Sequence, residues 1–530
     1  MKRTQCRYKF MLAGLLFLFS LWPLYLGAQE QETPPAGTTG GDSTVYKIRK
    51  IDFDVTGRSR PFALLYNGKL AEGDEMTGRE NLEFYIRDRT QQLVNQRVLE
   101  DDVHIDYTLD EAGEDGKVPV DLTVTVRDTW NIMVFPKPVY DNSGFDLTLK
   151  ARDYNFFGTM NPLRIDLGYF YDTKKNSRTR YEGSFNFLID TDIPFQALGF
   201  NWNINFDNEF NYTQGDPLNY RNSTGIFMEL PFKATTFTFG AEHYINVNEK
   251  NSDKNNDRGY GKNFDGVFNS VEFSTSWEIP TGIKVFGNNE LTYTPEIAEE
   301  IVYNPAGQDK EEWRDLRKGP FTTLDQTLGF GRIDWIGNFR KGLDVSFNNS
   351  NVYNHNQNVW NNDYSINTTG HFLFGDFFGL SAQLELRHWF HNYPDKLKNN
   401  LGDNLRGILN DEIQGNLMLS LNLEFPFKIF TARPSDWFNK SKMRIFNFEL
   451  HLSPVVDIGL VHLPDRLNDH ETDQDTLNMY YTGGIEAIVF PEFMRSFIIR
   501  FSFGFDLKEL AKTRHIPSPE FFIGLGHYFE

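Results

Sequence analysis

The fold is decided by residues Leu198–Phe206, which read LGFNWNINF and alternate large apolar side chains with glycine or asparagine. A period of two sends successive side chains to opposite faces of a β-strand. The same alternation recurs at 163–171, at 380–387 and at 521–529. We therefore expect residues 130–530 to form strand after strand, each with one apolar and one polar face.

The composition favours a barrel over other β folds. Hydrophobic residues make up 39% of the 530 residues and mean hydropathy is −0.49, too polar for a set of membrane-spanning helices, yet aromatic residues reach 15%. Strands that cross lipid must be paired on both sides, so their sheet must close. About 18 candidate strands are visible, a few of which would extend neighbours into loops. We expect a mainly β fold, a closed transmembrane antiparallel β-barrel of about 16 strands after one small α+β domain. A soluble β-sandwich or solenoid is the alternative.

The N-terminus has the layout of a secretory signal peptide. Residues 1–9 are basic, residues 10–26 are almost continuously apolar, and small residues precede Gln29. The apolar run is barely long enough to span a membrane, so we expect cleavage of residues 1–28 rather than their retention as an anchor. Residues 29–44 have the composition of a flexible linker. The single cysteine, Cys6, precedes the apolar run, so no disulfide is expected in the mature chain.

Residues 45–128 predict the small α+β domain. The expected elements are a strand at 51–56, a helix at 60–66, a helix after a Thr77-x-x-Glu80 capping box, and strands at 103–109 and 118–126. This order is shared by many small domains. A generic α+β domain that only supports the barrel therefore stays open.

Charge and motifs limit the function. The net charge of −20 argues against a nucleic-acid partner, which requires a basic face. The sequence has no phosphate-binding loop, no Gly-x-Ser-x-Gly elbow and no His-Glu-x-x-His motif. His388 and His391 are better explained by a strand-to-loop position than by metal binding. We expect no enzyme activity, no cofactor and no metal.

The start and the end of the barrel region carry recognisable motifs. Asn155-Phe156-Phe157-Gly158-Thr159 resembles the turn after the second strand in the BamA/TamA superfamily of outer-membrane assembly and translocation barrels. At the other end, Gly526, Tyr528 and Phe529 resemble the terminal-strand signal by which such barrels are recognised, although Glu530 follows them.

A third motif lies in the long connection 391–411. Leu405-Arg406-Gly407-Ile408 resembles the family's Arg-Gly-aromatic loop tip, which folds back into the barrel lumen, with isoleucine in place of the aromatic residue. In the family the loop arginine meets acids of the next two strands, and Glu424 and Asp457 stand at the matching positions. The alternation of the apolar residues around both acids independently predicts that they point inward. An ordinary Arg-Gly loop pair is the alternative.

The resemblance implies an outer-membrane protein that assists the insertion or translocation of proteins, with residues 45–128 as one POTRA-like domain in the periplasm. Its implied partners are outer-membrane lipids, unfolded outer-membrane or secreted client proteins, and periplasmic or lipoprotein partners. Pro136 and Pro138 would weaken the first strand as a seam, or shape the elbow before the barrel. A passive pore, a lipid-handling barrel or a surface antigen with the same fold stays open, as does a soluble ligand-binding β protein.

Overall fold

The computed structural model describes residues 43–140, 144–172, 183–213, 219–232, 235–247, 267–285, 289–304, 319–390, 401, 404–408, 413, 415–463, 476–513 and 519–525. The expected signal peptide, most of the expected linker and the terminal motif Gly526, Tyr528 and Phe529 lie outside these residues. Among the described residues, no helix is long and apolar enough to cross a bilayer.

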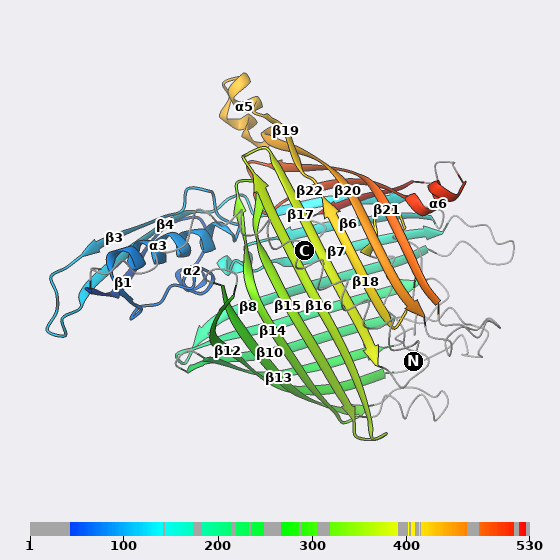
Figure 1. Ribbon diagram of the computed structural model, residues 1–530, viewed down its shortest axis with the longest axis horizontal. Coiled ribbons are helices and arrows are strands. Elements are labelled where there is room, and N and C mark those ends of the chain that lie inside the picture. The colour runs from blue at the N-terminus through cyan, green and yellow to red at the C-terminus, as the bar shows by residue number, and fades with distance from the viewer. Residues whose placement is uncertain are drawn as a thin grey trace.

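The first part of the chain folds into a four-stranded sheet with two helices packed on it (Figure 1). Its elements are β1 (Val45–Thr56), α2 (Pro61–Gly68), β2 (Glu75–Thr77), α3 (Arg79–Val94), β3 (His104–Leu109) and β4 (Val118–Arg127). The strand order is β2-β1-β4-β3, with β1 and β4 parallel. Ile48 and Leu122 of the sheet are buried together with Leu64 and Leu82 of the helices, which forms the core of this N-terminal unit. The expected helices and strands are confirmed, and β2 is an additional strand.

The expected capping box at the start of α3 is wrong. Thr77 belongs to β2 and pairs with Val45 of β1, and the helix begins at Arg79, one residue later than a cap at Thr77 requires. Gly78 instead occupies the N-cap with a positive φ of 86° and no side-chain cap. Sheet pairing has displaced the local capping preference of the Thr-x-x-Glu pattern.

The rest of the described chain forms the barrel. Its strands are β5 (Ile132–Tyr140), β6 (Gly144–Asp153), β7 (Leu163–Asp172), β8 (Gly183–Ala197), β9 (Phe200–Thr213), β10 (Asn219–Phe232), β11 (Thr235–Val247), β12 (Val267–Val285), β13 (Asn289–Asn304), β14 (Phe321–Ile336), β15 (Phe339–Asn354), β16 (Val359–Phe374), β17 (Phe378–Phe390), β18 (Leu417–Glu424), β19 (Phe427–Ala432), β20 (Phe448–Leu463), β21 (Thr476–Pro491), β22 (Ile499–Asp506) and β23 (Glu520–Leu525). Short helices are η1 (Phe156–Gly158), α5 (Pro434–Trp437), η4 (Ser441–Phe446) and α6 (Leu507–Thr513).

These strands close into one antiparallel ring in chain order, with β23 next to β5. Segments β18 and β19 both lie between β17 and β20, so the 19 segments in the described residues occupy 18 positions. The closed antiparallel β-barrel is confirmed as the fold. The strand number matches the 18 candidate segments of the sequence, without the expected reduction to about 16.

Two residues of the stretch that decides the fold lie outside a strand. Leu198 and Gly199 form the two-residue turn between β8 and β9, with φ of 56° and 83°. Both central residues of a tight hairpin turn of this hand need positive φ. The alternation therefore begins at Phe200, and the Leu198 side chain is 88% exposed.

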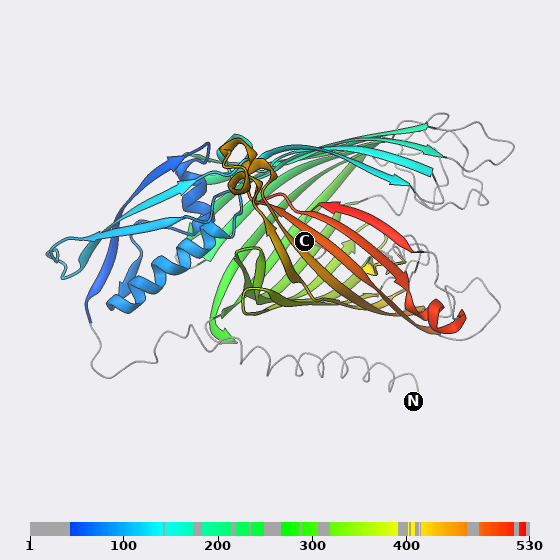
Figure 2. The same cartoon turned by 90° about the horizontal axis from the view of Figure 1, so that it is seen from above.

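The N-terminal unit lies against one end of the barrel (Figures 1 and 2). The buried Arg97 guanidinium donates to the backbone carbonyls of Arg495 at 2.6 Å and Gly337 at 3.1 Å, and it stacks over the Trp335 ring at 4.0 Å. Asn95 accepts a hydrogen bond from the Trp335 backbone N–H at 2.9 Å. Buried donors need specific partners, so these contacts set the position of the unit on the barrel.

Candidate functional site

The inner wall of the barrel is built by strict alternation along β18 and β20. In β18 every second residue is buried, and Glu424 is 2% exposed. In β20 the alternation buries Asp457 completely, whereas the neighbouring Val456 faces outward and is 36% exposed. Both carboxylates therefore lie inside the barrel. A carboxylate withdrawn from water in this way requires a cation or several hydrogen-bond donors.

Arg406 supplies the cation for both. Its Nε donates to Asp457 Oδ2 at 2.9 Å, its Nη2 to Asp457 Oδ1 at 2.5 Å, and its Nη1 to Glu424 Oε1 at 2.8 Å. The Arg406 backbone N–H also donates to Asp457 Oδ2, at 2.9 Å. The guanidinium is 1% exposed. This two-pronged contact with Asp457 fixes both the position and the rotation of the arginine, which a single-point ammonium cannot do.

Gly407 allows the loop tip to reach the wall. Its φ of 104° lies in the left-handed region, and an added Cβ would come within 2.5 Å of the Phe505 backbone nitrogen. Across the contact, a Cβ on Gly504 of β22 would lie 2.8 Å from the Gly407 nitrogen. Two glycines thus let the loop backbone pack directly on the β22 backbone. Sequence reasoning identified Gly407 and missed Gly504.

Apolar side chains hold the rest of the described loop. Leu401, Leu405, Ile408 and Ile413 are all less than 9% exposed and cluster with Met418 of β18 and Val461 of β20. Ile408 is 5% exposed, so it is buried at the position where the resembling family has an aromatic side chain. The loop tip is therefore anchored by an ion-pair network and a small apolar core together.

Sequence reasoning missed a third acid. Glu486 of β21 is fully buried, with Oε2 3.5 Å from Arg406 Nη1 and Oε1 3.9 Å from Arg500 Nε. A single carboxylate within the otherwise apolar stretch 483–491 was the available signal. The cluster thus joins acids of β18, β20 and β21 to the loop arginine and to Arg500 of β22.

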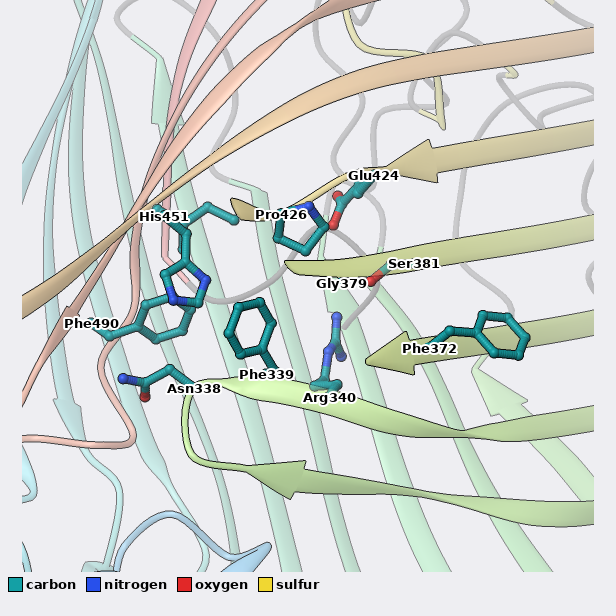
Figure 3. A pocket seen from close by; sticks show the side chains of 11 residues that line it. Asn338, Phe339, Arg340, Phe372, Gly379, Ser381, Glu424, Pro426, His451 and Phe490 are labelled. Carbon is teal, nitrogen blue, oxygen red and sulfur yellow. The ribbon is translucent and has the colours of Figure 1, made fainter. Parts of the chain in front are cut away.

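Glu424 also borders a small cavity of about 20 Å³, room for about one water molecule. Figure 3 shows Glu424 on its upper side and Arg340 on its lower side, with the His451, Phe339 and Phe490 rings closing one flank. This cavity beside the Arg406 cluster therefore has no room for a drug-sized ligand.

The turn motif near the barrel start occupies a different place. Asn155 is fully buried, and its Nδ2 donates to Ser59 Oγ at 2.9 Å and Asp128 Oδ2 at 3.1 Å. The Gly158 carbonyl accepts from the Arg60 backbone N–H at 2.9 Å. The turn therefore joins the barrel to the N-terminal unit and lies apart from the Arg406 cluster.

An ion pair reinforces this joint. The Arg58 guanidinium donates to both Asp153 oxygens, at 2.9 and 3.1 Å. Hydrogen bonding to that carboxylate raises the pKa of Arg58 above its ordinary value. Asp128 also accepts from the Ser59 hydroxyl at 2.7 Å. Charge-assisted hydrogen bonds to these two carboxylates fix the orientation of the N-terminal unit relative to the turn.

The arrangement fixes the loop tip on the inner wall, and the ion pairs of Arg406 with Glu424 and Asp457 are called the lock below. Among the described residues, no group of three or more His, Cys, Asp or Glu side chains could hold a metal ion. The chemistry of the Arg406 cluster is charge pairing in a region shielded from water, which holds the loop tip 404–408 on the inner wall.

Comparison with known proteins finds no matching family model and no matching curated protein. Among solved structures, the chain is similar to CdiB from Acinetobacter baumannii, with a TM-score of 0.44, 14% identity, and coverage of 91% of this chain and 73% of that one. For CdiB from Escherichia coli the TM-score is 0.40 and the identity 9%, with coverage of 98% of this chain and 97% of that one. For BamA from Haemophilus ducreyi lacking POTRA domains 1–3 the TM-score is 0.33 and the identity 12%, with coverage of 90% of this chain and 83% of that one. These likenesses concern the fold.

Proposed function

We propose that this protein is a non-enzymatic outer-membrane barrel that assists the insertion or translocation of protein chains. The observation that carries the proposal is the loop tip held inside the lumen by Arg406, Glu424 and Asp457. A lock of this kind has a purpose in a barrel that must stay sealed until a client arrives. Outer-membrane lipids surround the barrel, and periplasmic or lipoprotein partners dock on the N-terminal unit, which acts as a single POTRA-like domain in the periplasm.

The position of the N-terminal unit supports the same proposal. It lies at one mouth of the barrel, and β3 is an outer strand of its sheet (Figure 1). An extended client can add to such an edge through backbone hydrogen bonds. At the closure of the barrel, β5 contains Pro136 and lies next to β23. Proline lacks an N–H, so it lowers the number of ladder bonds that this strand can form.

Crosslinking tests the proposal in cells. We expect a photo-crosslinker at the exposed position Thr108 on β3 to trap outer-membrane or secreted chains. The matched control is a crosslinker at Glu114, which is also exposed and lies in the turn before β4. Depletion of the protein should lower the levels of the trapped chains. No adduct at Thr108 above the Glu114 background, together with an unchanged outer-membrane protein profile, would refute the proposal.

A cation-selective pore is the second candidate, because acids form a row on the inner wall. Glu242, Glu272 and Glu300 are register partners across β11, β12 and β13. These acids point to the inner face of the barrel, because adjacent residues such as Phe273, which is 53% exposed, face outward. Rings of carboxylates favour cations in pores.

We expect any current through the reconstituted barrel to prefer cations, and the triple change Glu242→Gln, Glu272→Gln and Glu300→Gln to reduce that preference. Reversal potentials across a salt gradient measure it. The control is Glu299→Gln, since Glu299 shares the outward face of Ile297 on the same strand. Equal selectivity in the triple variant and the wild type would exclude this row as the selectivity determinant.

A further inference from the structure

The connection between β19 and β20 carries a cluster of exposed large apolar side chains near the N-terminal unit. It contains α5 and η4 and projects beyond the barrel wall (Figures 1 and 2). Trp437, Phe438, Ile445 and Phe446 are 65%, 61%, 55% and 57% exposed. Residues 434–446 are named here the α5–η4 hairpin. Contact of four large, more than half exposed apolar side chains with water is unfavourable, so this surface calls for an apolar environment.

The apolar surface of the hairpin continues the lipid-facing wall of the barrel. Ile429 and Phe430 on β19, which leads into the hairpin, are 52% and 45% exposed. Phe430 packs edge-on against Phe448 at 5.7 Å, at the start of the strand that leaves the hairpin. Phe427, at the beginning of β19, stacks on Phe378 at 4.5 Å. Exposed apolar side chains therefore lie both on the outer face of β19 and on the hairpin that follows it.

The base of the hairpin is held in place. Asn447 Nδ2 donates to Ser435 Oγ at 2.8 Å and to Glu492 Oε2 at 2.9 Å. Arg433 donates to Glu492 Oε1 at 2.8 Å. Arg444 donates to Glu100 of the N-terminal unit at 3.3 Å, which places the hairpin at the same end of the barrel as that unit. The exposed apolar side chains are therefore presented in a fixed direction.

The charge of the hairpin identifies the lipid. Lys440 and Lys442 are exposed, and they lie between the two apolar pairs in the sequence. The hairpin also contains Arg444 and one acid, Asp436, so its net charge is positive. Aromatic residues beside lysines are typical of segments that lie at the membrane interface, where the rings enter the acyl boundary and the ammonium groups reach the headgroups.

We propose that the α5–η4 hairpin inserts into the leaflet on the side of the N-terminal unit and binds anionic phospholipid headgroups through Lys440 and Lys442. It anchors that end of the barrel and sets the depth of the N-terminal unit relative to the membrane. Contact with Glu100 through Arg444 transmits this depth to the unit. The proposal depends on the transmembrane barrel and is independent of whether the barrel inserts clients.

Lipid quenching tests the proposal on the full chain in vesicles of phosphatidylcholine and phosphatidylglycerol. A bimane label is attached at Phe438→Cys in a Cys6→Ser background, and spin-labelled phosphatidylglycerol or phosphatidylcholine is the quencher. The control label is attached at Ala112→Cys, an exposed turn position of the N-terminal unit. We expect quenching at position 438 and none at 112, with phosphatidylglycerol quenching more strongly.

A charge-reversed variant isolates the headgroup contribution. Lys440→Glu with Lys442→Glu should lower the preference for phosphatidylglycerol by roughly 25-fold or more, since each basic residue near an anionic surface contributes about a fivefold gain. Quenching by phosphatidylcholine should persist, because the apolar side chains are unchanged. Equal quenching by both lipids in the wild-type hairpin would overturn the proposal. So would a label at 438 that remains as accessible to water as the control, which is the result expected if a protein partner covers this surface instead.

Discussion

Arg406→Ala is expected to destabilise the barrel by about 3–5 kcal/mol, because it leaves buried carboxylates without their cation. Glu424, Asp457 and Glu486 are each no more than 2% exposed, and all three lie within 3.5 Å of an Arg406 nitrogen. With alanine at 406, these acids must take up protons or admit water. We expect the loop tip then to leave the wall, since only its apolar cluster still holds it.

Two measurements follow the loss of the lock. The temperature at which the folded barrel converts to its slower-migrating unfolded form on a gel should fall, and the conductance of the reconstituted barrel should rise as the loop vacates the lumen. Arg406→Lys should recover only part of the stability, because an ammonium cannot contact both Asp457 oxygens and Glu424 in one geometry. The matched control is Arg221→Ala. Arg221 is 57% exposed and lies 3.7 Å from Glu209, so its loss should change little. A melting temperature for Arg406→Ala equal to that of the control would contradict the lock.

The alternation of apolar and polar residues predicted the direction of side chains within a strand. The inward direction of Glu424 follows from a period of two that β18 keeps over its whole length. The start of α3 did not follow from the Thr77-x-x-Glu80 pattern, because pairing with Val45 in β1 outweighs one side-chain cap. The Leu198-Gly199 turn was read as strand because leucine contributes to the apolar alternation and lacks the usual turn chemistry of asparagine.

Long-range contacts could not be predicted from a single sequence. Arg97 donates to the carbonyl of Arg495, 398 positions away, and no periodicity links two such residues. Glu486 reaches Arg406 only because the curvature of the barrel brings β21 towards the loop tip, which requires the register of every intervening strand. The contacts of Arg406 could be anticipated from a resemblance and an alternation, whereas the completion of the cluster by Glu486 and Gly504 needed the folded barrel.

Gly158→Ala is expected to separate the N-terminal unit from the turn that holds it. A Cβ at this position would lie 2.0 Å from the Arg58 carbonyl oxygen, and the φ of 74° adds the left-handed cost of about 1–2 kcal/mol. The backbone at Arg58 must therefore move. It carries the N–H that donates to Asp128 at 2.6 Å, and Arg60 donates to the Gly158 carbonyl. Several bonds of the joint are lost together.

A matched pair of glycines separates this contact from backbone strain. Gly73 has a φ of 95° and Gly199 a φ of 83°, and an added Cβ at either meets nothing within 4 Å. Gly73→Ala and Gly199→Ala therefore place alanine in the same left-handed backbone region, with a similar loss of stability, and leave the contacts between the turn and the N-terminal unit intact. Limited proteolysis of the connection between β4 and β5 should accelerate in Gly158→Ala alone, because only there does the unit swing away and expose Thr129 and Asn131, which are 9% and 3% exposed in the wild type. Equal cleavage rates in all three variants would mean that the Asn155–Gly158 turn does not hold the N-terminal unit on the barrel, and that the Arg97 contacts alone suffice.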